Sequence, residues 1–75
     1  MNANQMLRKI FKEGGKSSSQ VSREIGHSRN YINSSLSRDI NLGVDNLATI
    51  LDAADYDLLA RHRSSGKEYV ITPRK

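Results

Sequence analysis

The stretch SSSQVSREIGHSRNYINSSL (residues 17–36) decides the fold, because it contains two short helical patterns separated by a glycine. Its opening SSSQ is a capping-box sequence. Ser17 can accept a hydrogen bond from the third helical residue, whose glutamine side chain can reach back to the Ser17 backbone. Val21 and Ile25 then lie four residues apart on one helix face. We therefore expect a helix over about residues 18–25.

The second half of the stretch is polar, yet its spacing also predicts a helix. Gly26 suits the left-handed position that commonly ends a helix, and Ser28 is a candidate N-cap for the next one. Ile32 and Leu36 form an apolar pair four residues apart, so we expect a helix over about residues 28–37. Serine and asparagine are poor helix formers, so only this narrow stripe would attach the element to a core.

Helical patterns also lie on both sides of this pair. The first begins after a candidate asparagine cap, Asn2 or Asn4, and stops at two consecutive glycines. Its apolar stripe consists of Leu7, Ile10 and Phe11. The other pattern lies within GVDNLATILDAA, and its helical spacing involves Val44, Leu47, Ile50, Leu51 and Ala54. The sequence thus predicts four helices.

The last twenty residues change character. YDLLARHR and KEYVITP are joined by SSG, and the second segment is rich in β-branched and aromatic residues, which favours a β-hairpin over about residues 57–72. A two-residue turn would pair Arg63 with Glu68, whereas a three-residue loop with a left-handed Gly66 would pair Leu59 with Ile71. A fifth helix through DYDLLARHR is the alternative to the hairpin.

Charge is distributed in three blocks along the 75 residues, whose net charge is +4. Residues 1–38 carry +5, residues 39–60 carry −5 through five aspartates, and residues 61–75 carry +4. A basic front and an acidic back suggest a molecule that orients in the field of a polyanion. From Ile25 to Arg38 there is no acidic side chain, as expected for a surface that faces phosphates.

Several function classes find no support in the sequence. There is no cysteine, so disulfides and thiolate metal sites are excluded, and the two histidines are scattered. No nucleophile-elbow serine, glycine-rich phosphate loop or partnered carboxylate pair occurs, so we expect no catalysis, cofactor, metal or small-molecule ligand. The start of the chain lacks the apolar run of a signal peptide, and no segment has the length of a membrane span. We expect a soluble, cytoplasmic protein with no membrane contact.

Residues 17–36 resemble the helix-turn-helix of the Xre/Cro-repressor family, and the resemblance extends from about Leu7 to Tyr56. The matching positions are Val21, Ser22, Ile25, Gly26 and Ile32. The resemblance implies a mainly α fold, with a four-helix lambda-repressor-like domain over residues 1–56. Residues 57–75 then form a C-terminal β-hairpin and basic tail. Ser35 departs from the family pattern, since a second aliphatic anchor is common there, and we expect Leu36 to supply the buried side chain.

In such folds the second helix of the motif lies in the major groove of DNA, and residues near its N-terminus reach base edges. The resemblance therefore implies sequence-specific binding of double-stranded DNA by a small transcriptional regulator, which we expect to be a repressor. An arginine can bond bidentately to guanine and an asparagine to adenine. The candidate base readers are Arg29, Asn30 and Ser34, followed by Asn33 and Tyr31. The candidate phosphate contacts flank this helix: Lys16, Ser17, Ser18, Ser28, Arg38 and Asn41.

One such domain reads few base pairs, so we expect a homodimer on two half-sites. The exposed edge of the hairpin can pair with the same edge of another copy. The candidate interface residues are Glu68, Tyr69, Val70, Ile71 and Thr72. The alternative function is a protein-binding adaptor or antitoxin-like module in which DNA binding is secondary.

Overall fold

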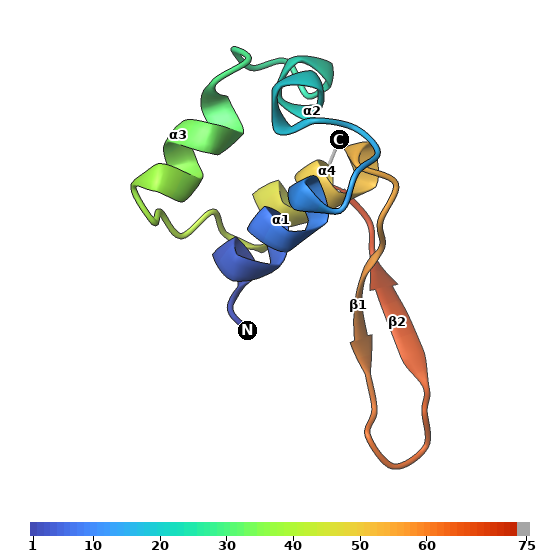
Figure 1. Ribbon diagram of the computed structural model, residues 1–75. Helices are drawn as coiled ribbons and strands as arrows, with labels where there is room; N and C mark the ends of the chain where they lie inside the picture. The colour runs from blue at the N-terminus through green and yellow to red at the C-terminus, as the bar shows by residue number, and fades with distance from the viewer. Residues whose placement is uncertain (74–75) are drawn as a thin grey trace.

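The computed structural model describes residues 1–73 as four helices followed by a two-stranded antiparallel hairpin (Figure 1). The elements are α1 (Ala3–Lys12), α2 (Ser18–Glu24), α3 (Tyr31–Ser37), α4 (Val44–Ala53), β1 (Leu58–Arg61) and β2 (Glu68–Ile71). The predicted layout of four helices and a C-terminal hairpin is confirmed, and the alternative fifth helix is wrong. Arg74 and Lys75, which the sequence assigns to a basic tail, lie outside the described residues.

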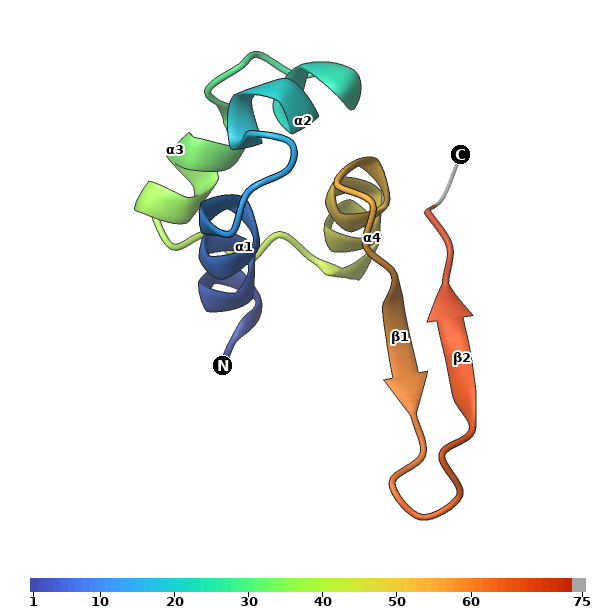
Figure 2. The ribbon, with the colours of Figure 1, turned by 45° about the vertical axis from the view of Figure 1, so that its right-hand side comes forward.

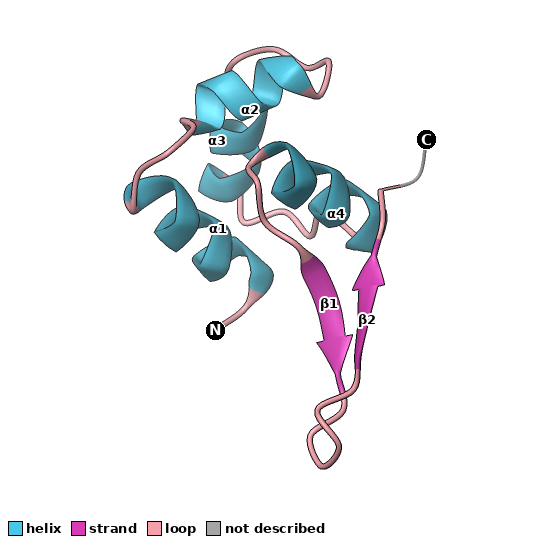
Figure 3. Cartoon of the chain, turned by 90° about the vertical axis from the view of Figure 1, so that its right-hand side faces the viewer, coloured by secondary structure: helices cyan, strands magenta, loops and turns pink. Residues whose placement is uncertain are grey.

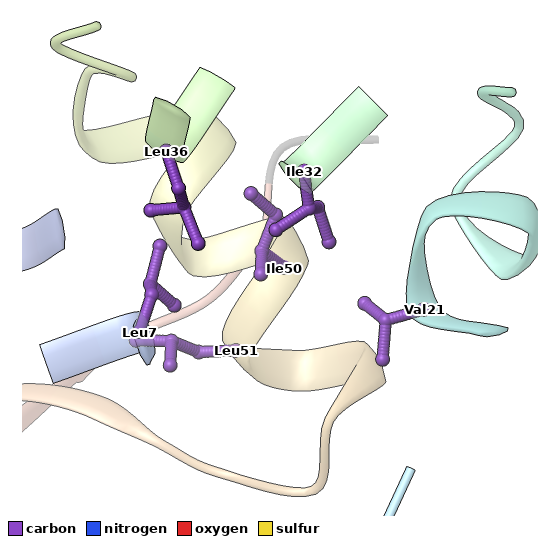
Figure 4. Close-up of a cluster of buried hydrophobic side chains, with 6 residues drawn as sticks. All are labelled: Leu7, Val21, Ile32, Leu36, Ile50 and Leu51. Atoms are coloured by element: carbon purple, nitrogen blue, oxygen red, sulfur yellow. The ribbon is translucent and has the colours of Figure 1, made fainter. Parts of the chain in front are cut away.

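Each of the four helices contributes to one hydrophobic core (Figure 4). The buried cluster consists of Leu7, Val21, Ile32, Leu36, Ile50 and Leu51. Most of the predicted apolar stripes face this cluster, but Val44 does not, because it is the first residue of α4 and remains 58% exposed. The polar helix α3 is attached by the predicted pair, with Ile32 fully buried and Leu36 only 6% exposed.

The starts of α1 and α2 follow from their caps. Asn2 accepts from the backbone of Gln5, whose side chain accepts in return from the Asn2 backbone, a complete capping box. At α2 the Ser17 hydroxyl accepts from the Gln20 backbone at 3.1 Å. The Gln20 side chain instead donates to Glu24, one turn further along. Only the first half of the capping box predicted for α2 is therefore confirmed.

The helix α3 begins later than predicted. Ser28 is not its N-cap: the Ser28 carbonyl accepts from the Tyr31 backbone at 3.0 Å, which closes a turn over the intervening residues. Asn30 occupies the cap position, with φ −93° and ψ 0° and no capping bond from its side chain. The helix predicted over residues 28–37 therefore shortens by a turn at its start, and Arg29 lies in the turn before α3.

The hairpin is present, but both of its predicted registers are wrong. Leu58 lies opposite Ile71 and Arg61 opposite Glu68, one position away from the register of the three-residue loop. The connecting loop is longer because the His62 ring accepts from the Ser65 backbone at 3.3 Å, which holds an additional residue within it. Gly66 is left-handed, as that alternative required, with φ +75°.

The hairpin projects from the helices as an arm, and its loop is the part of the chain most distant from α2 and α3 (Figures 1 and 3). The described chain measures 40 × 27 × 23 Å along its principal axes. Leu58, at the base of β1, is half-buried and packs against the helical core, which joins the arm to the body. None of the helices within residues 1–73 is both long and apolar enough to cross a membrane.

Candidate nucleic-acid interface

A buried serine joins α2 to the start of α3. The Ser22 hydroxyl is fully buried, donates to the Ser18 carbonyl at 2.8 Å and accepts from the Ile32 backbone at 3.2 Å. It therefore satisfies one of the backbone N–H groups that a helix leaves unpaired at its N-terminus. A larger side chain would have to displace the fully buried surroundings of Ser22, so its small size and its hydroxyl group together set how α3 meets α2.

The turn between these helices depends on Gly26. Its φ is +87°, a left-handed conformation that glycine adopts at little cost. The next residue, His27, donates its backbone N–H to the Ser22 carbonyl at 2.9 Å, as in a Schellman ending. The chain thus leaves α2 through a hydrogen-bonded turn.

Four of the five predicted base-reading residues are exposed on or just before α3: Arg29, Asn30, Asn33 and Ser34. Arg29 and Asn30 lie in the turn before the helix, and Asn33 and Ser34 lie within it. The buried residues Ile32, Ser35 and Leu36 occupy the opposite side of α3. The helix is therefore divided into an inward side that holds it and an outward side open to a partner.

Tyr31, the fifth candidate, has a different environment. Its ring stacks on the His27 ring, with centroids 3.8 Å apart and planes 8° from parallel. It is half-buried and packs against the core cluster. Because one ring face is covered by His27, Tyr31 supports the turn before α3, and only its uncovered atoms are available to a partner.

The hydroxyl and amide side chains predicted to contact phosphates are already hydrogen-bonded in part. The Ser17 hydroxyl caps α2, and the Ser18 hydroxyl donates to the Asn33 side chain at 2.8 Å. The Asn41 side chain accepts from the Gly43 backbone at 3.1 Å. These oxygens order the loops around α3, while Ser28 and Arg38 are exposed at its two ends.

Lys16 is held within the protein. Its ammonium group lies 3.0 Å from a Glu24 carboxylate oxygen and donates to the Ala53 carbonyl at 2.9 Å. The hydrogen bond from Lys16 lowers the pKa of Glu24, and the same bond raises the pKa of Lys16. Sequence reasoning assigned this lysine to phosphate binding; the structure gives it two partners that tie α2 to the end of α4.

The far end of α3 is held by α1, which sequence reasoning did not predict. The Arg8 guanidinium donates to the Leu36 carbonyl, one of the last carbonyl groups of α3. The Asn4 side chain donates to the Asp39 carboxylate at 2.8 Å and to the Ile40 carbonyl at 3.1 Å. These partners are separated by 28 residues or more in the chain, and no local sequence pattern signals such a contact.

The arrangement offers binding chemistry. Within residues 1–73, no group of three or more histidine, cysteine, aspartate or glutamate side chains is placed to hold a metal ion. Over the same residues, every buried side-chain nitrogen and oxygen has a hydrogen-bond partner. The exposed groups beside α3 are cationic, amide and hydroxyl groups, which suit hydrogen-bond acceptors and phosphates.

No protein-family model, curated protein or solved structure matches this chain.

Proposed function

We propose that this protein binds double-stranded DNA sequence-specifically as a small transcriptional regulator, acting as a repressor, with α3 in the major groove. The observation that carries the proposal is the division of α3. Ile32 and Leu36 anchor one side in the core, while Arg29, Asn30 and Asn33 are exposed on the other. A surface helix with so many amide and hydroxyl groups is poorly suited to stand alone but well suited to read base edges.

The geometry of α2, the turn and α3 supports a helix-turn-helix of the lambda-repressor-like kind. The left-handed Gly26 and the buried Ser22 fall at the positions on which the resemblance to the Xre/Cro-repressor family rests. Their hydrogen bonds explain why a glycine and a small residue are required there. The inward Leu36 compensates for Ser35, whose hydroxyl is buried and donates to the Tyr31 carbonyl at 3.0 Å.

Each outward residue has a plausible base or phosphate partner. Arg29 offers a guanidinium fork for the two acceptors of guanine, and Asn30 offers the donor and acceptor pair that matches adenine. Because both precede the first turn of α3, they lie at the end of the helix that enters the groove in this type of fold. Ser28 and Arg38, exposed at the two ends of α3, are placed to contact the backbone on either side.

The electrostatics of this side of the molecule favour a polyanion. No acidic side chain occurs from Ile25 to Arg38, and the nearest preceding carboxylate, Glu24, is paired with Lys16 at 3.0 Å. The five aspartates all follow Arg38 in the chain. Binding should therefore weaken steeply with salt, because each neutralised phosphate releases counterions.

The decisive experiment is selection of bound duplexes from a random pool, followed by binding measurements on the enriched site. We expect Arg29→Ala to weaken binding to that site by about 1–3 kcal/mol while leaving non-specific binding nearly unchanged. The control is Arg63→Ala, which removes the same charge from the exposed hairpin loop. It should leave the preference between the enriched site and random duplex intact.

Two results would overturn the proposal. One is a selection that enriches no sequence; the other is a site preference that survives both Arg29→Ala and Asn30→Ala. The first result would favour the protein-binding adaptor or antitoxin-like alternative, in which the exposed hairpin carries the main interaction.

A further inference from the structure

The outer strand of the hairpin exposes more apolar surface than any helix face. Tyr69 is 61% exposed, Val70 54% and Ile71 36%, and Leu59 on the neighbouring strand is 39% exposed. Because strand residues alternate between faces, these side chains lie on both sides of the hairpin. Leu58 joins one of these faces to the core, and the rest of the arm has no covering element within residues 1–73. Such a strand requires a partner if it is not to aggregate.

The hydrogen bonds of the hairpin define which backbone groups of β2 face outward. The His62 N–H donates to the Lys67 carbonyl at 2.8 Å, and these residues lie opposite each other in the register that continues through β1 and β2. Bonded and non-bonded pairs alternate along an antiparallel ladder. Tyr69 and Ile71 therefore direct their backbone groups toward β1, whereas Glu68 and Val70 direct theirs to the free edge.

The free edge of β2 is accessible along its whole length. The strand β1 lies beside the helical body and follows directly from α4, whereas the outer side of β2 faces away from the helices (Figure 2). Pro73 has no backbone N–H and ends the edge at one side, and the hydrogen-bonded loop at Gly66 ends it at the other. The edge is thus short and limited at both ends, with Val70 at its centre.

We propose that two copies of this chain pair antiparallel through the outer edges of β2, on a two-fold axis at Val70, to form a four-stranded sheet. Only this register pairs every outward-facing residue from Glu68 to Thr72 with another: Val70 opposite the partner's Val70, and Glu68 opposite the partner's Thr72. Tyr69 then lies opposite the partner's Ile71 in a closely spaced pair, an aromatic and β-branched combination that stabilises sheets.

A second copy is the occupant because the edge is self-complementary. In this register the carboxylate of Glu68 faces a threonine, so no like charges lie directly opposite each other. The pairing is isologous and uses both free β2 edges, which closes the assembly at two chains. The remaining edges of the sheet belong to β1, beside the helical bodies (Figure 3).

This dimer is the one that the proposed DNA binding calls for, but its test needs no DNA, so either proposal can fail alone. Val70→Lys and Val70→Glu each place like charges directly opposite one another on the axis, and each should weaken self-association by at least about tenfold. An equimolar mixture of the two variants should pair again. The control pair is Ser64→Lys and Ser64→Glu, which place the same charges in the exposed loop.

Sedimentation equilibrium measures the result. The natural chain and both Ser64 variants should approach twice 8.4 kDa, each Val70 variant alone should remain near 8.4 kDa, and the mixture should recover the larger mass. A natural chain that stays at a single mass at about millimolar concentration would overturn the pairing. So would a mixture that fails to recover the mass that the natural chain reaches.

Amide hydrogen exchange provides a second measurement on the unmodified chain. The Tyr69 N–H faces β1 and should be protected at every concentration at which the hairpin is formed. The Val70 N–H faces the free edge, and its protection should rise with protein concentration as copies pair. Fast exchange at Val70 in a sample of dimer mass would place the interface elsewhere and overturn the proposal.

Discussion

The helical body and the hairpin use the same kinds of apolar side chain in opposite ways. In the body, Leu7, Val21, Ile32 and Ile50 are completely removed from solvent, whereas in the hairpin Tyr69 and Val70 are more than half exposed. The body completes its burial within one chain, and the hairpin leaves its burial to a contact outside that chain. Stability of the monomer is therefore concentrated in residues 1–56, and association is concentrated in the arm.

The largest test of this contrast compares one deletion in each region. Ile32→Ala should lower the free energy of unfolding by about 2–5 kcal/mol, because it leaves a cavity at a fully buried site. A single core of this size supplies only about 3–5 kcal/mol, so the variant should be largely unfolded. Val70→Ala should change it by less than about 0.5 kcal/mol in dilute solution. Urea unfolding followed by circular dichroism measures both, and equal losses would contradict the contrast.

A smaller loss is expected where the body depends on a buried polar contact. Ser22→Ala removes the hydroxyl that accepts from the Ile32 backbone and leaves that buried N–H without its partner. The free energy of unfolding should fall by about 1–3 kcal/mol. Ser64→Ala, in the exposed hairpin loop, should leave it unchanged, and the same urea titration compares the two. An unchanged midpoint for Ser22→Ala would mean that α3 is held by apolar packing alone.

The junction between body and hairpin should allow a gain in stability. Asp55 ends α4 with a left-handed φ of +68°, a conformation that costs residues other than glycine about 1–2 kcal/mol. Glycine avoids that cost but loses backbone entropy, so Asp55→Gly should stabilise the fold by about 0.5–1 kcal/mol in thermal unfolding. Asp57→Gly is the matched control: φ is not positive there, and the change should be destabilising.

The smallest expected effect concerns pH and lies within the body. The Lys16 ammonium holds the pKa of Glu24 below its ordinary value of 4.5. The stabilisation from this pair is therefore complete above pH 4.5 and is lost as the pH falls through the lowered pKa. Glu24→Gln should flatten that part of a plot of stability against pH, and Lys16→Gln should do the same. A slope that persists in both variants would assign the acid sensitivity to other carboxyl groups.

Sequence reasoning succeeded where the determining contacts are local. The cap at Asn2, the cap at Ser17, the left-handed Gly26 and the inward pair in α3 all involve residues a few positions apart. The buried side chain of Leu36, expected because Ser35 is not aliphatic, is found in the structure. Short-range hydrogen bonding and helical periodicity were sufficient for these features.

The errors have physical causes that periodicity does not encode. The start of α3 was placed too early because the turn closed by Ser28, with the ring stack of His27 and Tyr31, competes with helix at those residues. The hairpin register was missed because the His62 ring bonds Ser65 and lengthens the loop. Contacts between distant segments, such as that of Arg8 with α3, have no local sequence signature.

The attachment of α3 at both ends has a consequence for how this protein can change. Ser22 fixes its beginning, Arg8 fixes its end, and buried side chains fix its inner side. None of these attachments uses Arg29 or Ser34, which are exposed. Those outward positions are free to vary in evolution or engineering while the scaffold stays constant. Exchanging them should produce a family of proteins with one shape and different binding preferences.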